Sequence, residues 1–175
     1  MGRFSLFVVF IAAGRGFVFG QLQEENLFKI FEGKWDEPGV KSGYVTINGD
    51  TAIPLGKYYY CFTDTMQNFA IVWKYDGRII GINSADKELF EVFKFDNGPD
   101  YVSDGMFRII KDGKIGFANS EGEIKIQPQF DCAFPFVQGK AKVSNNCIPE
   151  KLGEHSGWES AQWYYVDKSG NKIDP

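Results

Sequence analysis

The sequence predicts an all-β fold of tandem three-stranded antiparallel meanders, and three observations support this prediction. Short segments that alternate apolar and polar residues, such as 124–127, are typical of half-buried strands. Turn signals such as Asp112-Gly113 separate these segments, because glycine accepts a positive φ without steric cost. Nothing within residues 107–144 recurs at helical spacing, and the same order of strand and turn returns elsewhere in the chain.

The pattern is clearest in residues 107–144. Apolar β-formers precede the turn at Asp112-Gly113, and a second turn at 119–123 follows the next apolar segment. Pro128 ends the following strand or places it at a sheet edge, because proline cannot donate to a strand ladder. The expected strands of this unit are 107–110, 115–118, 124–127 and 141–143.

The same unit recurs before and after this stretch. Gly43, Gly81 and Gly116 mark matching hinges, and Tyr164 takes this place in the last copy. Lead strands are expected at 27–31, 69–73 and 106–110, and turns at Asn48, Asn83, Asn119 and Asp167. The predicted repeat domain, residues 21–175, has a lead strand at 27–35, units at about 43–80, 81–115 and 116–162, and a partial unit at 163–175.

Two segments of the central unit, 113–119 (GKIGFAN) and 124–131 (IKIQPQFD), resemble the WG-repeat family, also known as KWG or WG β-repeats. The resemblance covers roughly residues 27–175, although tryptophan is kept in the hinge only at Trp35 and Trp163. It implies an all-β repeat array of a family whose activity is largely undefined and usually taken to be binding. It supplies no catalytic residue. An open twisted array and a closed, propeller-like or barrel-like form are both compatible with these units.

Length and composition suit a single packed domain. The chain has 175 residues, of which 43% are hydrophobic and 17% aromatic. The formal net charge is -4, and lysines and arginines form no cluster. Because phosphate contacts need clustered cations, these features argue against a nucleic-acid partner.

The first 20 residues have the layout of a signal peptide. A basic start containing Arg3 precedes an apolar stretch at 4–13, and small residues lead to Gly20. The alternative, a membrane anchor, needs about 20 apolar residues, and Arg15 interrupts this stretch. We therefore expect a secreted or periplasmic protein with residues 1–20 removed and no membrane span after cleavage.

Five aromatic or imidazole side chains are candidate ligand contacts. Tyr58, Tyr59 and Tyr60 are either a stacking platform for sugar rings or, as we favour, amphipathic side chains on a half-wet sheet. His155 and Trp158 lie in an insertion at about 145–162, where a feature specific to one partner is most expected.

The sequence indicates no catalytic, metal or cofactor site. Asp96 and Asp131 follow aromatic residues at comparable places in successive units, but a repeated aspartate at a strand end usually caps a turn. His155 is the single histidine and lacks the further ligands that zinc needs. Serine-triad chemistry has no G-x-S-x-G signature here.

Three cysteines permit at most one disulfide. Cys61 and Cys132 occupy similar places in the first and third units, and pairing Cys132 with Cys147 closes a shorter loop. The second pairing is expected to be awkward, because the two residues lie near opposite ends of the strand between them. Buried free cysteines are an equal alternative.

These observations favour a binding or scaffold protein that recognises a protein or a glycan. A hydrolase acting through Asp and Glu side chains is the alternative, and two carboxylates converging in one cleft would support it. A purely structural envelope component is the third hypothesis.

Overall fold

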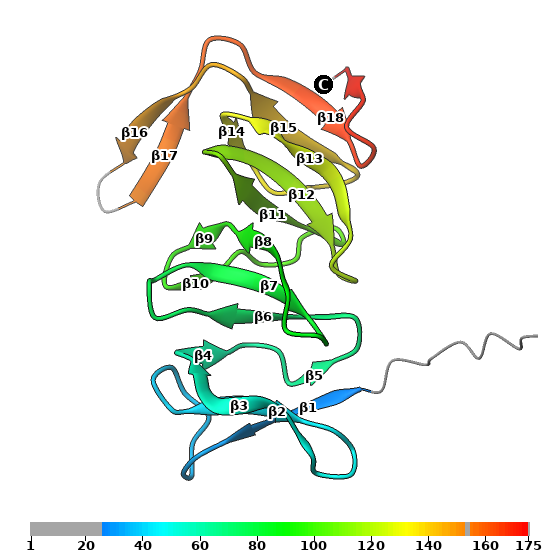
Figure 1. The fold of residues 1–175 in the computed structure, drawn as a ribbon. Helices are drawn as coiled ribbons and strands as arrows, with labels where there is room; N and C mark the ends of the chain where they lie inside the picture. Colours follow the sequence, from blue (N-terminus) through cyan, green and yellow to red (C-terminus); the bar gives the residue numbers. More distant parts are fainter. Residues whose placement is uncertain (1–25, 153–154, 175) are drawn as a thin grey trace, which may run out of the picture.

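The computed structural model describes residues 26–152 and 155–174. These residues form β-strands and turns only, so the predicted all-β fold is confirmed (Figure 1). None of the sheets they form closes on itself, and the strands follow one another as an open array from β1 to β18. The predicted signal peptide lies outside the described residues. Nowhere in the described part is there a helix long and apolar enough to cross a membrane.

Five sheets make up the array, all with antiparallel pairing. The first has the order β3-β2-β1-β5 and contains β1 (Leu27–Phe31), β2 (Ser42–Val45), β3 (Thr51–Tyr58) and β5 (Thr65–Met66). The central sheet has the order β13-β12-β11-β8-β7-β6-β4. Its strands are β4 (Tyr60–Cys61), β6 (Phe69–Trp73), β7 (Ile79–Asn83), β8 (Glu88–Val92), β11 (Met106–Lys111), β12 (Lys114–Asn119) and β13 (Ile124–Phe130).

The third sheet has the order β14-β15-β18-β19 and lies at the end of the array that holds the C-terminus (Figure 1). It contains β14 (Cys132–Ala133), β15 (Lys140–Ser144), β18 (Tyr164–Asp167) and β19 (Lys172–Ile173). Two hairpins project from the array, β9 (Lys94–Phe95) with β10 (Gly98–Pro99), and β16 (Ile148–Leu152) with β17 (His155–Glu159). The predicted insertion at about 145–162 thus largely forms the β16–β17 hairpin.

The same turn ends the second strand of each repeat. Its first residue donates its backbone N–H to the carbonyl four residues later, and its side-chain oxygen accepts the N–H of that later residue. The four residues with this pattern are Thr46, Asn83, Asn119 and Asp167. Three of them were predicted, but the first turn begins at Thr46 and not at Asn48, because the side chain that closes the ring is the threonine hydroxyl.

The three hinge glycines differ in strand position and in surroundings. Gly43, Gly81 and Gly116 each pair with an isoleucine of the preceding strand. A Cβ at Gly43 or Gly116 would lie 2.4 Å from a backbone carbonyl oxygen of the third strand, at a register shift. A Cβ at Gly81 would instead meet the Phe90 ring at 2.6 Å.

Gly81 is therefore displaced by one residue from its predicted equivalents. Counted back from the turn, it matches Tyr44 and Phe117, which are fully buried aromatic residues. In the second unit the side chain of Phe90 comes from the neighbouring strand to cover this glycine. The aromatic volume is kept, but a different strand supplies it.

Three apolar clusters form the core, and each is shared by consecutive units. The first joins the unit of β1–β3 to β6 and β7, the second joins β7 and β8 to β11 and β12, and the third joins β11–β13 to the last sheet. The largest fully buried side chains include Tyr44, Phe107, Phe117 and Phe136. Because each unit buries one face against the next, the array is held together by neighbour contacts.

Cys132 and Cys147 form a disulfide, with Cα atoms 6.2 Å apart, and Cys61 is free and buried. The expectation that this pairing is awkward was wrong. Strands β14 and β15 form a hairpin in which Cys132 lies opposite Ser144. Because Cys147 is only three residues after Ser144, it lies close to Cys132. The disulfide fastens the start of the β16–β17 hairpin to the third sheet.

Candidate functional site

The three consecutive tyrosines separate between the core and the surface. Tyr58 is 7% exposed, packs in the first core cluster and donates its hydroxyl to Asp86 at 2.7 Å. Tyr59 and Tyr60 are half-buried at the surface. The structure therefore brings Tyr59 and Tyr60 to a surface and directs Tyr58 inward.

Tyr59 and Tyr60 belong to a group of five aromatic rings in contact. Tyr59 lies edge-on to Trp73, with ring centroids 5.2 Å apart, and to Tyr75 at 6.0 Å. Phe62 stacks on Trp73 at 5.9 Å and meets Tyr60 at 5.0 Å. Edge-to-face and offset contacts of this kind are the favoured arrangements of aromatic pairs.

Basic side chains extend this group along the array. Lys94, the first residue of β9, places its Nζ 5.1 Å from the centre of the Trp73 ring. The guanidinium of Arg108 lies 4.1 Å from the centroid of Phe93 and 5.8 Å from that of Phe95, the residues before and after Lys94 in the chain. These cation–π contacts connect the second unit to the third.

A second group of rings continues from Phe93. Trp158 of β17 lies 5.8 Å from Phe93 and 5.8 Å from Phe134, and Phe134 lies 5.3 Å from Trp163. Lys142 sits over the last two rings, with its Nζ 4.7 Å from the Trp163 centroid and 5.8 Å from that of Phe134.

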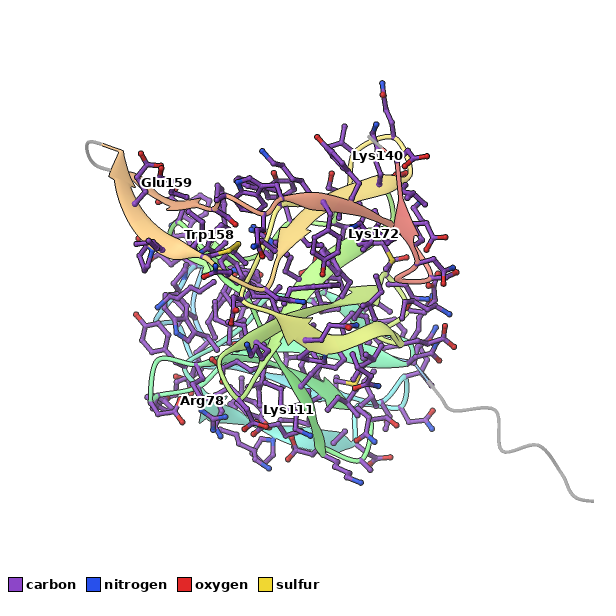
Figure 2. The ribbon with its side chains drawn as sticks, turned by 90° about the horizontal axis from the view of Figure 1, so that it is seen from above. Arg78, Lys111, Lys140, Trp158, Glu159 and Lys172 are labelled. Atoms are coloured by element: carbon purple, nitrogen blue, oxygen red, sulfur yellow. A yellow bond between two sulfur atoms is a disulfide. The ribbon has the colours of Figure 1, made fainter. Side chains whose placement is uncertain are left out.

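We name this surface the aromatic edge. It comprises Tyr59, Tyr60, Phe62, Trp73, Tyr75, Phe93, Phe95, Tyr101, Phe134, Trp158 and Trp163. Strand β4, the end of β6 and both projecting hairpins lie on one side of the array, at the left of Figure 1. Figure 2 shows Trp158 beside β17, across the end sheet from Lys140 and Lys172.

Three cations along this side of the array occupy one repeated position. Lys29, Arg108 and Lys142 lie at the same place in the first strand of their units, opposite Tyr44, Phe117 and Tyr165 respectively. Each covers an aromatic ring, since Lys29 lies 4.2 Å from the centroid of Tyr60. The second unit has Ile71 at this position.

Two of these three cations are neutralised within the protein. Lys29 Nζ lies 2.6 Å from Asp36; burial lowers its pKa, but hydrogen bonds to Asp36 and Tyr60 outweigh this and raise the pKa above its ordinary value. Arg108 and Asp100 are buried, with side chains 3% and 0% exposed, and are joined by two hydrogen bonds of 2.9 and 2.5 Å.

Lys142 differs from both. Among residues 26–152 and 155–174, no carboxylate lies within 4.0 Å of its Nζ and no acceptor receives a hydrogen bond from it. Lys94 is in the same situation within the described residues. The aromatic edge therefore carries two lysines, Lys94 and Lys142, that no carboxylate of the described residues pairs with.

Asp96 and Asp131 have separate surroundings in the described residues. His155 lies on β17, but its side chain is outside the described residues. Asp131 pairs with Lys114 at 2.5 Å, whereas Asp96 has a φ of 53° in the turn between β9 and β10. Within the described residues, His, Cys, Asp and Glu side chains form no group of three that could hold a metal ion.

A cleft of about 510 Å³ opens between β8, β11 and β13. Its carboxylates include Glu88 and Glu91, whose oxygens lie 2.9 and 3.9 Å from the Arg78 guanidinium. Arg78 and Lys111 both line this cleft and are labelled on the same side of Figure 2. Both carboxylates therefore face the Arg78 guanidinium, and their side chains are 42% and 35% exposed.

Sequence reasoning found Tyr59, Tyr60 and Trp158 but missed the residues that connect them. It missed Phe93 and Phe134, and it missed the basic lead-strand residues, which were visible in the sequence as a recurring basic residue in an apolar strand, for example Arg108 within MFRIIK. Their meaning depends on which rings the stacked units bring over them.

Comparison with known proteins identifies one repeat. The family model of the WG containing repeat matches residues 115–146, which run from β12 through β15. No curated protein and no solved structure matches the chain. The match confirms the resemblance found in the central unit.

Proposed function

We propose that this chain, in which residues 115–146 form a WG containing repeat, is a secreted or periplasmic binding protein whose aromatic edge holds a glycan chain. The observation that carries the proposal is the pair of ring-and-cation groups from Tyr75 to Trp163, which meet at the adjacent residues Phe93 and Lys94. Sugar rings present C–H faces that pack on aromatic faces, and their hydroxyls suit a surface that is partly polar.

The exposure of the rings supports binding. Tyr75 is 68% exposed, Phe95 50% and Tyr101 51%, so half or more of the surface of each residue is open to a ligand in the free protein. Their line extends over several units and is not a single deep pocket, which suits a polymer better than a small molecule.

The extracytoplasmic location has two independent supports. One is the signal-peptide layout of residues 1–20. The other is the disulfide between Cys132 and Cys147, because disulfides persist mainly in oxidising compartments. Expression with residues 1–20 fused to a reporter enzyme, followed by fractionation, tests this part.

Glycan binding is tested by affinity electrophoresis of the mature chain through gels that contain a soluble polysaccharide, with isothermal titration for any that retards it. The panel holds a neutral glucan, a xylan, polygalacturonate and its methyl ester. We expect Trp73→Ala and Trp158→Ala each to weaken binding by about tenfold, the loss of one ring contact of about 1.4 kcal/mol.

Trp35→Ala is the matched control. Trp35 is 74% exposed and contributes no ring to the aromatic edge, so its removal leaves affinity unchanged. Failure of every polysaccharide to retard the protein, or equal losses in Trp35→Ala and Trp73→Ala, would overturn the proposal.

A further inference from the structure

We propose that the glycan is acidic, and that two lysines of β15, Lys140 and Lys142, bind its carboxylates at the C-terminal end of the aromatic edge. This inference rests on the proposed function and adds the chemical class of the ligand. It concerns a surface formed by the last sheet of the array, which Figure 2 views from above.

The two lysines share one face of β15. Residues two apart on a strand point to the same side, about 6.6 Å apart along it. Lys142 lies over Trp163 and Phe134, and Lys140 Nζ lies 4.9 Å from the centroid of the Tyr165 ring. The pair therefore alternates with aromatic faces, and all of these rings come from the loop after β14, from the residue before β18 or from β18 itself.

Comparison with equivalent cations shows what is missing at Lys142. Lys29 has Asp36 and Arg108 has Asp100, and in both cases the carboxylate comes from the same chain. In the described part of the chain neither Lys140 nor Lys142 has a carboxylate within 4.0 Å. The cation at this repeat position pairs with an aspartate in two units, but in the last unit it pairs with no carboxylate of the described residues.

A carboxylate from a ligand completes this arrangement. Both ammonium groups are on half-buried side chains beside aromatic rings, where attraction to an anion is screened less than in bulk water. The protein as a whole has a net charge of -4, so unspecific attraction of polyanions is not expected. A chain of uronate residues offers both a sugar face for Trp163 and a carboxylate for each lysine.

The decisive comparison uses polygalacturonate and its methyl ester, which have the same backbone but differ in free carboxylates. We expect the acid form to bind at least tenfold more tightly than the ester at low ionic strength. Lys142→Gln should remove most of this preference and reduce the salt dependence of binding, while Lys142→Arg should keep it.

Lys172→Gln is the matched control, because Lys172 also lies over a ring, 5.1 Å from the centroid of Tyr164, but belongs to β19. The affinity of the Lys172→Gln variant for polygalacturonate should equal that of the unmodified protein. Circular dichroism and thermal unfolding verify that each variant is folded before binding is measured.

The outcomes separate the two proposals. Equal binding of acid and ester, both weakened by Trp73→Ala, would leave the glycan proposal standing and overturn the acidic one. Tighter binding of polyglutamate or of single-stranded oligo(dT) with the same dependence on Lys142 would also overturn it. So would a concentration-dependent dimer, detected by sedimentation, that Lys142→Gln abolishes while no polysaccharide binds.

Discussion

Arg108 and Asp100 form a buried ion pair inside a largely apolar array. Both side chains are almost fully buried, and Arg108 also donates to the carbonyl oxygen of Ala133 at 3.1 Å. Removing charges from water is costly, so the pair is tolerated only because nearly every donor and acceptor is satisfied. The Arg108 guanidinium also lies 4.1 Å from the centroid of the Phe93 ring, so this buried pair contacts the aromatic edge.

Replacing Asp100 by alanine should destabilise the protein by about 3–5 kcal/mol, because it leaves the Arg108 guanidinium buried without a counter-charge. The free energy of unfolding from urea titration measures the effect. Lys125→Gln, which removes an exposed ion pair with Glu123, is the control and should show no resolvable change. Equal effects of the two substitutions would contradict the assignment of a buried pair.

The core also contains two groups whose ionisation at alkaline pH destabilises the folded state. Burial raises the pKa of the Cys61 thiol and of the Tyr44 hydroxyl above their ordinary values. In the unfolded chain these groups lose their protons at lower pH than in the folded chain, so the folded state binds more protons above about pH 9. The stability that they contribute is complete below this pH and is lost as the pH rises further.

We therefore expect the free energy of unfolding to fall between pH 9 and pH 11. In Cys61→Ala the fall should be less steep, because one of the titrating groups is absent. Urea denaturation at stepped pH measures this slope. An identical slope in both proteins would show that the Cys61 thiol titrates at its ordinary pKa when folded.

Close approach between strands explains two of the hinge glycines. A Cβ at Gly116 would lie 2.4 Å from the carbonyl oxygen of Ile126 and 2.5 Å from the nitrogen of Pro128, both of which are backbone atoms of β13. At Gly81 the nearest obstacle is the Phe90 side chain, which can rotate. The β2 and β12 hinges therefore require glycine more strictly than the β7 hinge.

Gly116→Ala should cost at least about 2 kcal/mol, because the β12–β13 ladder must separate to admit a methyl group. Gly81→Ala should cost less, since only one ring must move. Thermal and urea unfolding of the two variants compare them directly. A larger loss in Gly81→Ala would contradict the proposed difference between backbone and side-chain obstacles.

The β16–β17 hairpin depends on the disulfide at its base. The bond between Cys132 and Cys147 closes a loop with a sequence separation of 15, which corresponds to about 3 kcal/mol of stabilisation in the chain-entropy estimate. Trp158 on β17 packs against Phe93 and Phe134, so the hairpin also places part of the aromatic edge.

The double variant Cys132→Ala, Cys147→Ala should lose about 2–4 kcal/mol of stability and expose Trp158. Tryptophan fluorescence should shift to longer wavelength and acrylamide should quench it more strongly, with Trp158→Phe as the control that identifies the responsible residue. Unchanged fluorescence in the double variant would show that ring packing alone holds the hairpin.

The whole molecule is a linear array in which each core cluster joins only neighbouring units. Stability in such arrays is greatest where a unit has neighbours on both sides. We expect amide hydrogens of β7, β11 and β12 to exchange most slowly and those of β2 and β19 to exchange earlier. Mass spectrometry of deuterium uptake under native conditions measures this order, and uniform protection would indicate a single cooperative unit.

By itself the sequence determined the all-β class, the repeated order of strand and turn, and three of the four turn residues. These features depend on alternation along a strand and on local turn chemistry, which neighbouring residues specify. The resemblance of residues 115–146 to the WG containing repeat follows from the same local pattern.

Only the tertiary structure decided which side chains meet. It pairs Cys132 with Cys147 and brings Tyr59 and Trp158 onto one edge. At Gly81, where other units have an aromatic residue, it places the ring of Phe90. These contacts join residues of different strands and units, so they depend on how the sheets stack and by how much each register shifts. A period of two assigns a residue to a face but does not say what the next unit places over it.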